Sequence, residues 1–274
     1  MQPPLFSIIT PSYNYAKYVR ECIESVKAQE GVTFEHIVYD AGSTDGTLDI
    51  LREYPHLDVT VEPDRGMSDA INKGFRKAKG QWVMWLNSDD RLLPGALKAV
   101  AAFAEKHPEA DVVYGAWNFV NADGVFIRAM KALPFSVNMI IEHGCYIAST
   151  ALFLRRETTI DEGFLLNVNF RYVMDGEYYA RLGRAGKRFV NYNKPLADFR
   201  QHEAALSARR FEDNGIDANL RRMHQYSESA AIHRTYGWSF FSDLKWNLVV
   251  DVILHERYRF QKGFMKLITP WISE

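Results

Sequence analysis

The sequence has few of the features that mark several large classes of protein. Its 274 residues include two cysteines, Cys22 and Cys145, which lie far apart and outside any Cys-x-x-Cys spacing. This argues against a disulfide framework and against a zinc site. No charge of one sign dominates, because 33 basic residues nearly balance 34 acidic ones for a formal net charge of −1. We therefore expect no nucleic-acid partner, since such binding depends on a basic surface.

Long hydrophobic runs are missing as well. Residues 1–4 show no basic stretch followed by an apolar one, so we expect no secretory signal. The most apolar run near the end, 248–254, is interrupted by Asp251 and falls short of the roughly 20 residues that a membrane helix needs. With 47% hydrophobic and 24% charged residues, the composition is that of a globular protein. We expect a cytoplasmic protein without a transmembrane helix.

Residues 5 to about 118 alternate short β-rich runs with longer amphipathic segments. This order is typical of the α/β class, in which helices flank a mostly parallel sheet. The predicted strands span residues 5–10, 34–40, 57–62 and 81–86, and the predicted helices span 15–29, 68–78 and 94–106.

The pattern loosens after residue 118. A turn at 121–124 is predicted to join two antiparallel strands, 112–119 and 125–129. Three further elements are expected: a buried strand over 150–155, a helix over 172–185, and mostly helical residues from 211 to the end.

Polar residues follow each of the first four predicted strands. They occupy segments 10–14, 40–46, 62–66 and 87–90. Because ligands of an open α/β sheet bind beyond the carboxyl ends of its strands, the four segments predict one shared site. The same residue types also form turns and helix caps, which is the alternative interpretation of any single loop.

The adjacent acids Asp89 and Asp90 are the most informative of these residues. Two carboxylates beyond an apolar strand repel each other unless a cation or hydrogen-bond donors compensate. Mg²⁺ or Mn²⁺ resolves that repulsion, because such ions are held by one or two carboxylates while substrate phosphates complete the coordination. Capping of the helix near Pro94 explains one of the acids but not both.

Two nucleotide-binding motifs are absent. No Gly-Lys-Ser/Thr phosphate loop is present, and no Gly-x-Gly-x-x-Gly turn follows the first strand, which argues against P-loop nucleotidases and dinucleotide oxidoreductases. Recognition of a nucleotide then depends on side chains. Tyr13 is a candidate for stacking on a base, or alternatively a core aromatic residue, and Asp40 is a candidate hydrogen-bond acceptor.

The four polar segments resemble, as an ordered set, the motifs of family 2 glycosyltransferases with the GT-A fold. The matching segments are 7–14, 40–47, 63–66 with 70–74, and 86–90, and the resemblance extends over roughly residues 5–205. It implies an inverting enzyme that uses a nucleotide-diphosphate sugar, most often UDP-linked, and a divalent metal, Mn²⁺ or Mg²⁺. The acceptor it implies is a hydroxyl group, on a glycan or a lipid-linked molecule, in polysaccharide or glycoconjugate synthesis.

The resemblance also implies roles for individual residues. The residues that it places around the nucleotide are Pro11, Tyr13, Asp40, Asp64, Arg65 and Asp89. Asp90 would coordinate the metal, with Asp89 near both the ribose and the metal. The chain departs from the fuller Asp-x-Asp-Asp motif at Asn87, which leaves one carboxylate fewer.

Segment 172–182 is similar to the family segment in which an acid at the start of a helix deprotonates the acceptor. By position that acid is Asp175, and Glu177 is the alternative. Inversion requires a base on the acceptor side, because the hydroxyl loses its proton as it attacks the anomeric carbon. Either acid is also suited to a simple interaction with the helix dipole.

Segment 199–207 resembles the closing motif in which a histidine or arginine reaches the diphosphate or the metal. His202, as a metal ligand, and Arg200 are the candidates here. His143 and Ser149 are weaker candidates on the acceptor side.

These assignments divide the chain into a nucleotide-sugar-binding half at 1–118, an acceptor-binding half at 119–207 and a helical extension at 208–274. From Trp238 onward the extension is aromatic and basic. Such a helix can contact the inner face of a membrane peripherally, pack on the catalytic domain or form a homodimer face.

Two other functions remain as alternatives. A sugar nucleotidyltransferase would carry a glycine-rich loop with basic residues after the first strand, where this chain has Pro-Ser-Tyr-Asn. A catalytically silent sugar- or partner-binding protein on the same scaffold would not need the paired acids and Asp175.

Overall fold

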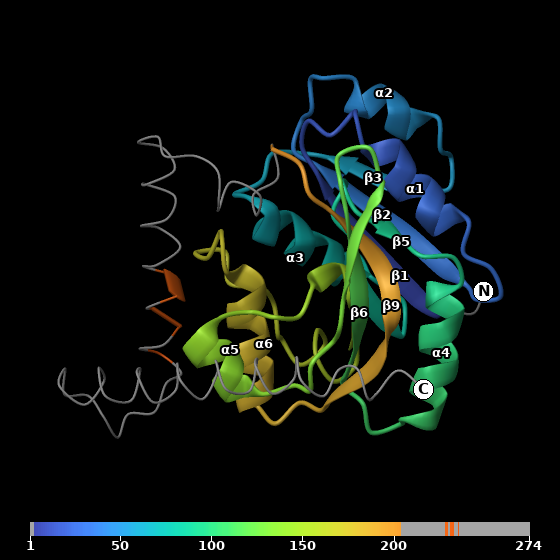
Figure 1. The fold of residues 1–274 in the computed structure, drawn as a ribbon. Helices are drawn as coiled ribbons and strands as arrows, with labels where there is room; N and C mark the ends of the chain where they lie inside the picture. The colour runs from blue at the N-terminus through green and yellow to red at the C-terminus, as the bar shows by residue number, and fades with distance from the viewer. Residues whose placement is uncertain (1–2, 204–227, 230, 233–234, 236–274) are drawn as a thin grey trace.

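The computed structural model describes residues 3–203, 228–229, 231–232 and 235. Nine strands of these residues form one sheet (Figure 1). The strands are β1 Phe6–Ser12, β2 Phe34–Asp40, β3 Leu57–Val61, β4 Trp82–Trp85, β5 Arg91–Leu92, β6 Val112–Val120, β7 Phe126–Met130, β8 Leu152–Arg155 and β9 Phe189–Arg200. The helices are α1 Val19–Lys27, α2 Thr47–Arg52, α3 Met67–Lys77, α4 Ala96–Lys106, α5 Val137–His143 and α6 Met174–Arg184, with a 3₁₀ turn at Ser149–Ala151.

The strand order is β3-β2-β1-β4-β8-β6-β9-β5, and β7 pairs with β6 outside this path. Strands β1 to β4 are parallel, whereas β8 runs antiparallel to both β4 and β6. Strand β9 lies parallel to β6 and antiparallel to β5. The predicted α/β class is therefore confirmed, with a parallel half and a mixed half.

Apolar layers cover both faces of the sheet. Ile8 and Ile9 of β1 are both fully buried yet belong to different core clusters, as expected for alternating side chains of a strand. Figure 1 shows α3, α5 and α6 on one side and α1 and α4 on the other. Helix α3 approaches β1 so closely that a side chain at Gly74 would collide with Ile9. This contact explains a glycine inside a helix.

The structure departs from the predicted elements in several places. The helix expected from Pro94 begins at Ala96, because Gly95 adopts a left-handed conformation with φ 73°. The expected strand over 150–155 starts as the 3₁₀ turn and becomes β8 only at Leu152. Helix α2 and strands β5 and β9 were not predicted. Strand β9 contains Pro195 and its pairing with β6 shifts register, so it lacks a regular strand pattern.

The predicted helical extension at 208–274, with its aromatic tail, lies outside the described residues except for positions 228–229, 231–232 and 235. The proposed domain boundaries stay predictions. Across the described part of the chain, the longest apolar helices fall short of what crossing a membrane requires.

Candidate active site

A large cleft of about 2260 Å³ is lined by the loops that follow the first strands and by residues of the second half of the chain. Of the residues predicted from the sequence, six line it: Pro11, Tyr13, Asp64, Arg65, Asp175 and His202. The others are buried and do not line the cleft: Asp40, Asp89, Asp90, Ser149, Glu177 and Arg200. His143 is the last residue of α5, and its side chain is not described.

The loop after β1 presents an exposed ring to the cleft. Tyr13 is 58% exposed, whereas Pro11 and Ser12 before it are buried. The ring is therefore available for stacking and is not a core residue. The hydroxyl of Ser12 is buried without a hydrogen-bond partner among the described residues and borders the cleft beside Tyr13.

Asp40 shapes the loop that follows β2. Its Oδ1 accepts the N–H groups of Gly42 (3.0 Å) and Ser43 (2.7 Å), and its Oδ2 accepts the Ser43 hydroxyl (2.7 Å). The side chain is buried, and Ala41 rather than Asp40 borders the cleft. Contact of Asp40 with a base stays a prediction.

Asp64 and Arg65 open helix α3 at the rim. Asp64 accepts the N–H of Gly66 (2.7 Å), which fixes the turn before the helix. Arg65 forms an ion pair with Asp69 (3.2 Å), and its side chain is 74% exposed. The guanidinium is thus solvated at the cleft edge, where an anionic ligand can reach it.

Asp89 and His202 meet at the base of the cleft. The carboxylate Oδ2 of Asp89 lies 2.9 Å from Nε2 of His202, although the residues are 113 positions apart. The Tyr15 hydroxyl also bonds to Asp89, and the Tyr18 ring lies 4.6 Å from the imidazole. Burial, followed by the charges of Asp89 and Asp90, raises the pKa of Tyr15, which therefore stays a donor.

Asp90 points away from that meeting point. Its Oδ1 accepts the backbone N–H of Arg200 (2.9 Å), and its Oδ2 accepts the side-chain amide of Asn87 (3.1 Å). Burial, and then the charge of Asp89, raise the pKa of Asp90 well above its usual range. The two adjacent acids thus have different environments, and the metal role predicted for Asp90 stays a prediction.

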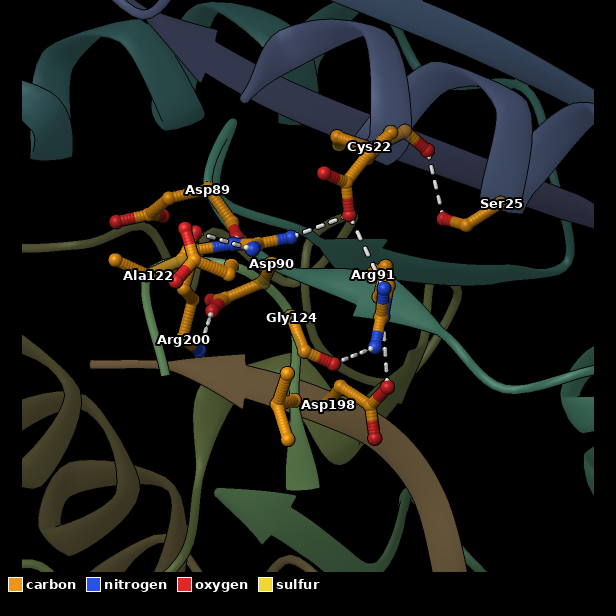
Figure 2. A network of polar contacts seen from close by, with 12 residues as sticks. Cys22, Ser25, Asp89, Asp90, Arg91, Ala122, Gly124, Asp198 and Arg200 are labelled. Atoms are coloured by element: carbon orange, nitrogen blue, oxygen red, sulfur yellow. Dashed lines mark hydrogen bonds and ion pairs between the residues drawn. The ribbon is translucent and has the colours of Figure 1, made fainter. Parts of the chain in front are cut away.

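Arg200 is buried, with 1% exposure, directly behind the paired acids (Figure 2). Its guanidinium donates to the carbonyls of Asp89 (2.8 Å) and Ala122 (2.9 Å) and to the carboxylate of Glu21 (2.6 Å). It also lies over the Tyr18 ring, 5.0 Å from the centroid. The diphosphate contact predicted for Arg200 is thus replaced by contacts within the protein, which tie the turn after β4 to the end of β9.

Arg91 extends this network, as Figure 2 shows. It donates to Glu21 (3.1 Å), to Asp198 (2.7 Å) and to the carbonyl of Gly124 (2.7 Å). The sequence did not predict these contacts. Its pattern indicates only an exposed helical residue at Glu21 and a residue that follows a strand at Arg91. Together the two arginines join α1, β5, β9 and the β6–β7 turn.

Helix α6 carries the predicted base in its first turn. Asp175 lines the cleft and its Oδ1 accepts the N–H of Gly176 (2.8 Å). Glu177 is 1% exposed and forms a two-point ion pair with Arg181, at 2.9 and 3.1 Å. Of the two acids, Asp175 alone borders the cleft. On the acceptor side, Cys145 borders it, whereas Ser149 is buried in the 3₁₀ turn.

Asp89 and His202 are the candidate ligands for a divalent ion. Within the described residues, no three His, Cys, Asp or Glu side chains converge. Mg²⁺ and Mn²⁺ are held by one or two carboxylates when substrate phosphates and water supply the other ligands, so a larger cluster of protein ligands is not required.

The comparisons with known proteins agree with this fold. The family model for glycosyl transferase family 2 matches residues 7–164. The chain therefore belongs to glycosyl transferase family 2, and the family and GT-A-type fold predicted from the motifs are confirmed.

Two curated relatives are informative. The chain is 40% identical, over 121 residues, to a PGL/p-HBAD biosynthesis glycosyltransferase of Mycobacterium bovis, a match covering 42% of this chain and 47% of the relative. It thus spans about half the length of such mycobacterial relatives. It is 31% identical over 221 residues to the putative teichuronic acid biosynthesis glycosyltransferase TuaG of Bacillus subtilis, covering 76% of this chain and 84% of TuaG.

Solved structures show the same fold. S. aureus TarS 1-349 in complex with UDP-GlcNAc superposes with a TM-score of 0.60 at 22% identity, covering 88% of this chain and 76% of TarS 1-349. The mannosyltransferase PcManGT of Pyrobaculum calidifontis, in complex with GDP-Man and Mn²⁺, gives a TM-score of 0.55 at 16% identity, covering 100% of this chain and 89% of that one.

Proposed function

We propose that the protein is an inverting, metal-dependent glycosyltransferase that moves a sugar from a nucleotide-diphosphate donor, a UDP-sugar, to a hydroxyl acceptor. One observation carries the proposal: a single cleft is bordered by the loop at Tyr13, by His202 beside Asp89, and by Asp175. Similarity to TuaG and to the mycobacterial relatives supports a role in polysaccharide or glycoconjugate synthesis.

The chain's own residues have separate tasks in this reaction. Asp175 takes the proton of the acceptor hydroxyl as its oxygen attacks the anomeric carbon. Asp89 and His202 would hold the divalent ion, and Asp90, with Arg200, fixes the turn on which Asp89 stands. The ion, when bound, neutralises charge on the leaving diphosphate. Tyr13, which is exposed at the cleft, stacks on the base.

The test is transfer and binding by matched variants. Purified protein is incubated with UDP-sugars and Mn²⁺, and released UDP is measured. We expect Asp175→Asn to bind UDP normally but to transfer about 10²- to 10⁴-fold more slowly. We expect Asp89→Asn to weaken Mn²⁺-dependent UDP binding, while Asp161→Asn, at the surface ion pair with Arg156, behaves as wild type.

Two results would overturn the proposal. Transfer by Asp175→Asn at the wild-type rate would show that another group is the base. If the wild-type protein binds UDP but releases no UDP from any UDP-sugar, a catalytically silent binder is favoured. If it releases pyrophosphate from a nucleoside triphosphate and a sugar phosphate, it is a nucleotidyltransferase.

A further inference from the structure

The segment before Asp175 forms one wall of the cleft and is fixed at both ends. Its first part is held by helix α3: the Asn72 side chain exchanges two hydrogen bonds of 2.8 Å with the backbone of Leu166. The Ser68 hydroxyl donates to the carbonyl of Phe170 (3.3 Å). Phe170, like Ser68, borders the cleft, so these contacts place the wall against the donor half.

The second part of this segment is held by one carboxylate from far along the chain. Glu228 accepts the N–H groups of Arg171 (3.0 Å), Tyr172 (2.9 Å) and Val173 (3.2 Å). Successive backbone N–H groups that converge in this way form a concave anion site, and here Glu228 fills it. Val173 is the N-cap of α6 and its side chain cannot accept a bond, so the carboxylate supplies the polar partner at this helix start.

The position of Glu228 is itself anchored. Residues 228, 229, 231, 232 and 235 are helical, and the spacing of four places Glu228 and Ile232 on one helical face. Ile232 is 5% exposed and belongs to the apolar cluster that contains Tyr178 and Tyr179 of α6. Glu228 therefore reaches residues 171–173 from a packed element.

We propose that Glu228 is a positioning residue for Asp175. Its carboxylate fixes the backbone of residues 171–173, and this sets where the first turn of α6 presents Asp175 to the cleft. The negative charge also suits the N-terminal end of the helix. The inference rests on the proposed function, in which Asp175 is the base, and it gives residues beyond the matched region 7–164 a part in the reaction.

Backbone hydrogen exchange tests the contact without any activity measurement. We expect Glu228→Ala to accelerate exchange at residues 171–173 at least about tenfold, because the three N–H groups lose their acceptor. Glu228→Gln, which keeps one acceptor oxygen, should lie between Glu228→Ala and wild type. Ser229→Ala, exposed and adjacent, is the matched control and should match wild type. Unchanged exchange at 171–173 in Glu228→Ala would overturn the proposal.

Kinetics test the consequence. We expect Glu228→Ala to lower kcat for transfer about tenfold to a hundredfold, since small misplacement of a catalytic group is costly. The affinity for UDP with Mn²⁺ should stay within a factor of two of wild type. Added formate, which fits the vacated anion site, should restore part of the transfer rate, whereas chloride at equal ionic strength should not.

The two proposals fail in different ways. A wild-type transfer rate in Glu228→Ala, or a fall in UDP affinity as large as the fall in kcat, would overturn the positioning role while leaving the glycosyltransferase assignment in place. Absence of transfer by the wild-type protein with every donor would overturn the proposed function, and the exchange experiment would still decide whether Glu228 fixes the segment.

Discussion

The two sides of the cleft are built by different kinds of contact. On the donor side, Asp40 bonds to groups two and three residues away, and Asp64 bonds to a group two residues away. On the closing side, Asp90 and Arg200 are 110 positions apart, and Glu228 lies 55 positions from Val173. The donor-side contacts named here need only the few residues that follow one strand. The closing-side contacts need the whole sheet and the segment at 228, because their partners are far apart in the sequence.

This difference separates two kinds of function. The donor-side loops combine short turns with bonds between neighbouring loops, such as the bond from the Asn14 N–H to the Ser43 hydroxyl, and they display Tyr13, Asp64 and Arg65 to a ligand. The closing side instead brings groups together: His202 against Asp89, and the first turn of α6 against the cleft. Changes on the closing side should therefore affect geometry and stability together, and changes on the donor side should affect stability or donor binding without changing kcat.

The largest effect should come from the centre of the closing side. Arg200→Met removes the donor of the Asp89 and Ala122 carbonyls and leaves the Glu21 carboxylate with Arg91 alone, at a cost of about 3 kcal/mol in unfolding free energy. Urea denaturation measures this change. Because the turn carrying Asp89 loosens, Mn²⁺-dependent UDP binding should weaken as well.

Arg155→Met is the matched control for that variant. Arg155 also donates to two backbone carbonyls, of Ala110 and Pro108, but away from the cleft. It should cost less stability and leave UDP binding unchanged. If both variants bind UDP as wild type does, the closing network does not position Asp89.

A smaller effect, with a pH signature, should come from the sheet of the donor side. Burial lowers the pKa of His36 to about 3, with a small further contribution from His56. The folded state keeps His36 neutral, while the unfolded state takes up a proton below its ordinary pKa of about 6.5. The contribution of neutral His36 to the free energy of unfolding is therefore fully present above pH 6.5. It is lost as pH falls toward 3, at about 1.4 kcal/mol per pH unit.

The variant His36→Gln isolates that contribution. Between pH 6.5 and 5 the wild-type protein should lose about 2 kcal/mol more unfolding free energy than the variant. Transfer activity at pH 7 should match wild type, because His36 bonds to Thr10 inside the sheet and not to the cleft. Parallel stability curves for the two proteins would contradict the prediction.

The next effect should appear in ligand binding on the donor side. Asp40→Asn keeps the shape of the side chain but weakens its bonds to Gly42 and Ser43, because the acceptor loses its charge. We expect a loss of about 1 kcal/mol in stability and a severalfold weaker UDP affinity. Isothermal titration with UDP measures the affinity, and kcat at saturating donor should not change. A fall in kcat with unchanged affinity would place Asp40 on the catalytic side instead.

The fold was predictable as far as local pattern determines it. Strands β1 to β4 are short apolar runs bounded by turn residues, and all four were found. Strand β9 was missed because Asn193, with φ 55°, and Pro195 interrupt the alternation, so β6 rather than a sequence pattern determines that it is a strand. The β6–β9 pairing that extends the sheet therefore cannot be predicted from the local sequence.

The candidate site was predictable in its members more than in their arrangement. Asp89 and Asp90 are adjacent, and the family resemblance places both at the metal, with Asp89 also near the ribose. A backbone bond from Asp90 to the carbonyl of Asn87 (3.0 Å) closes a turn, and their side chains leave in different directions. Asp89 meets His202, while Asp90 meets the backbone of Arg200. Only the position of β9, distant in sequence, decides which acid meets His202, a residue that lines the cleft.

The smallest effect should come from a short ion pair at the surface. Arg20 donates to both oxygens of Glu53 at 2.7 Å, yet the side chains are 49% and 52% exposed. The 2.6 Å bond from Arg200 to Glu21 has a similar length, but its arginine is 1% exposed. Because water solvates and screens the surface pair, we expect Arg20→Ala to shift the thermal midpoint by no more than about 1 °C. Calorimetry of the Arg20 and Arg200 variants therefore tests whether bond length or burial determines how much an ion pair stabilises the fold. A larger shift of the thermal midpoint for Arg20→Ala would mean that bond geometry alone predicts the stabilising contacts.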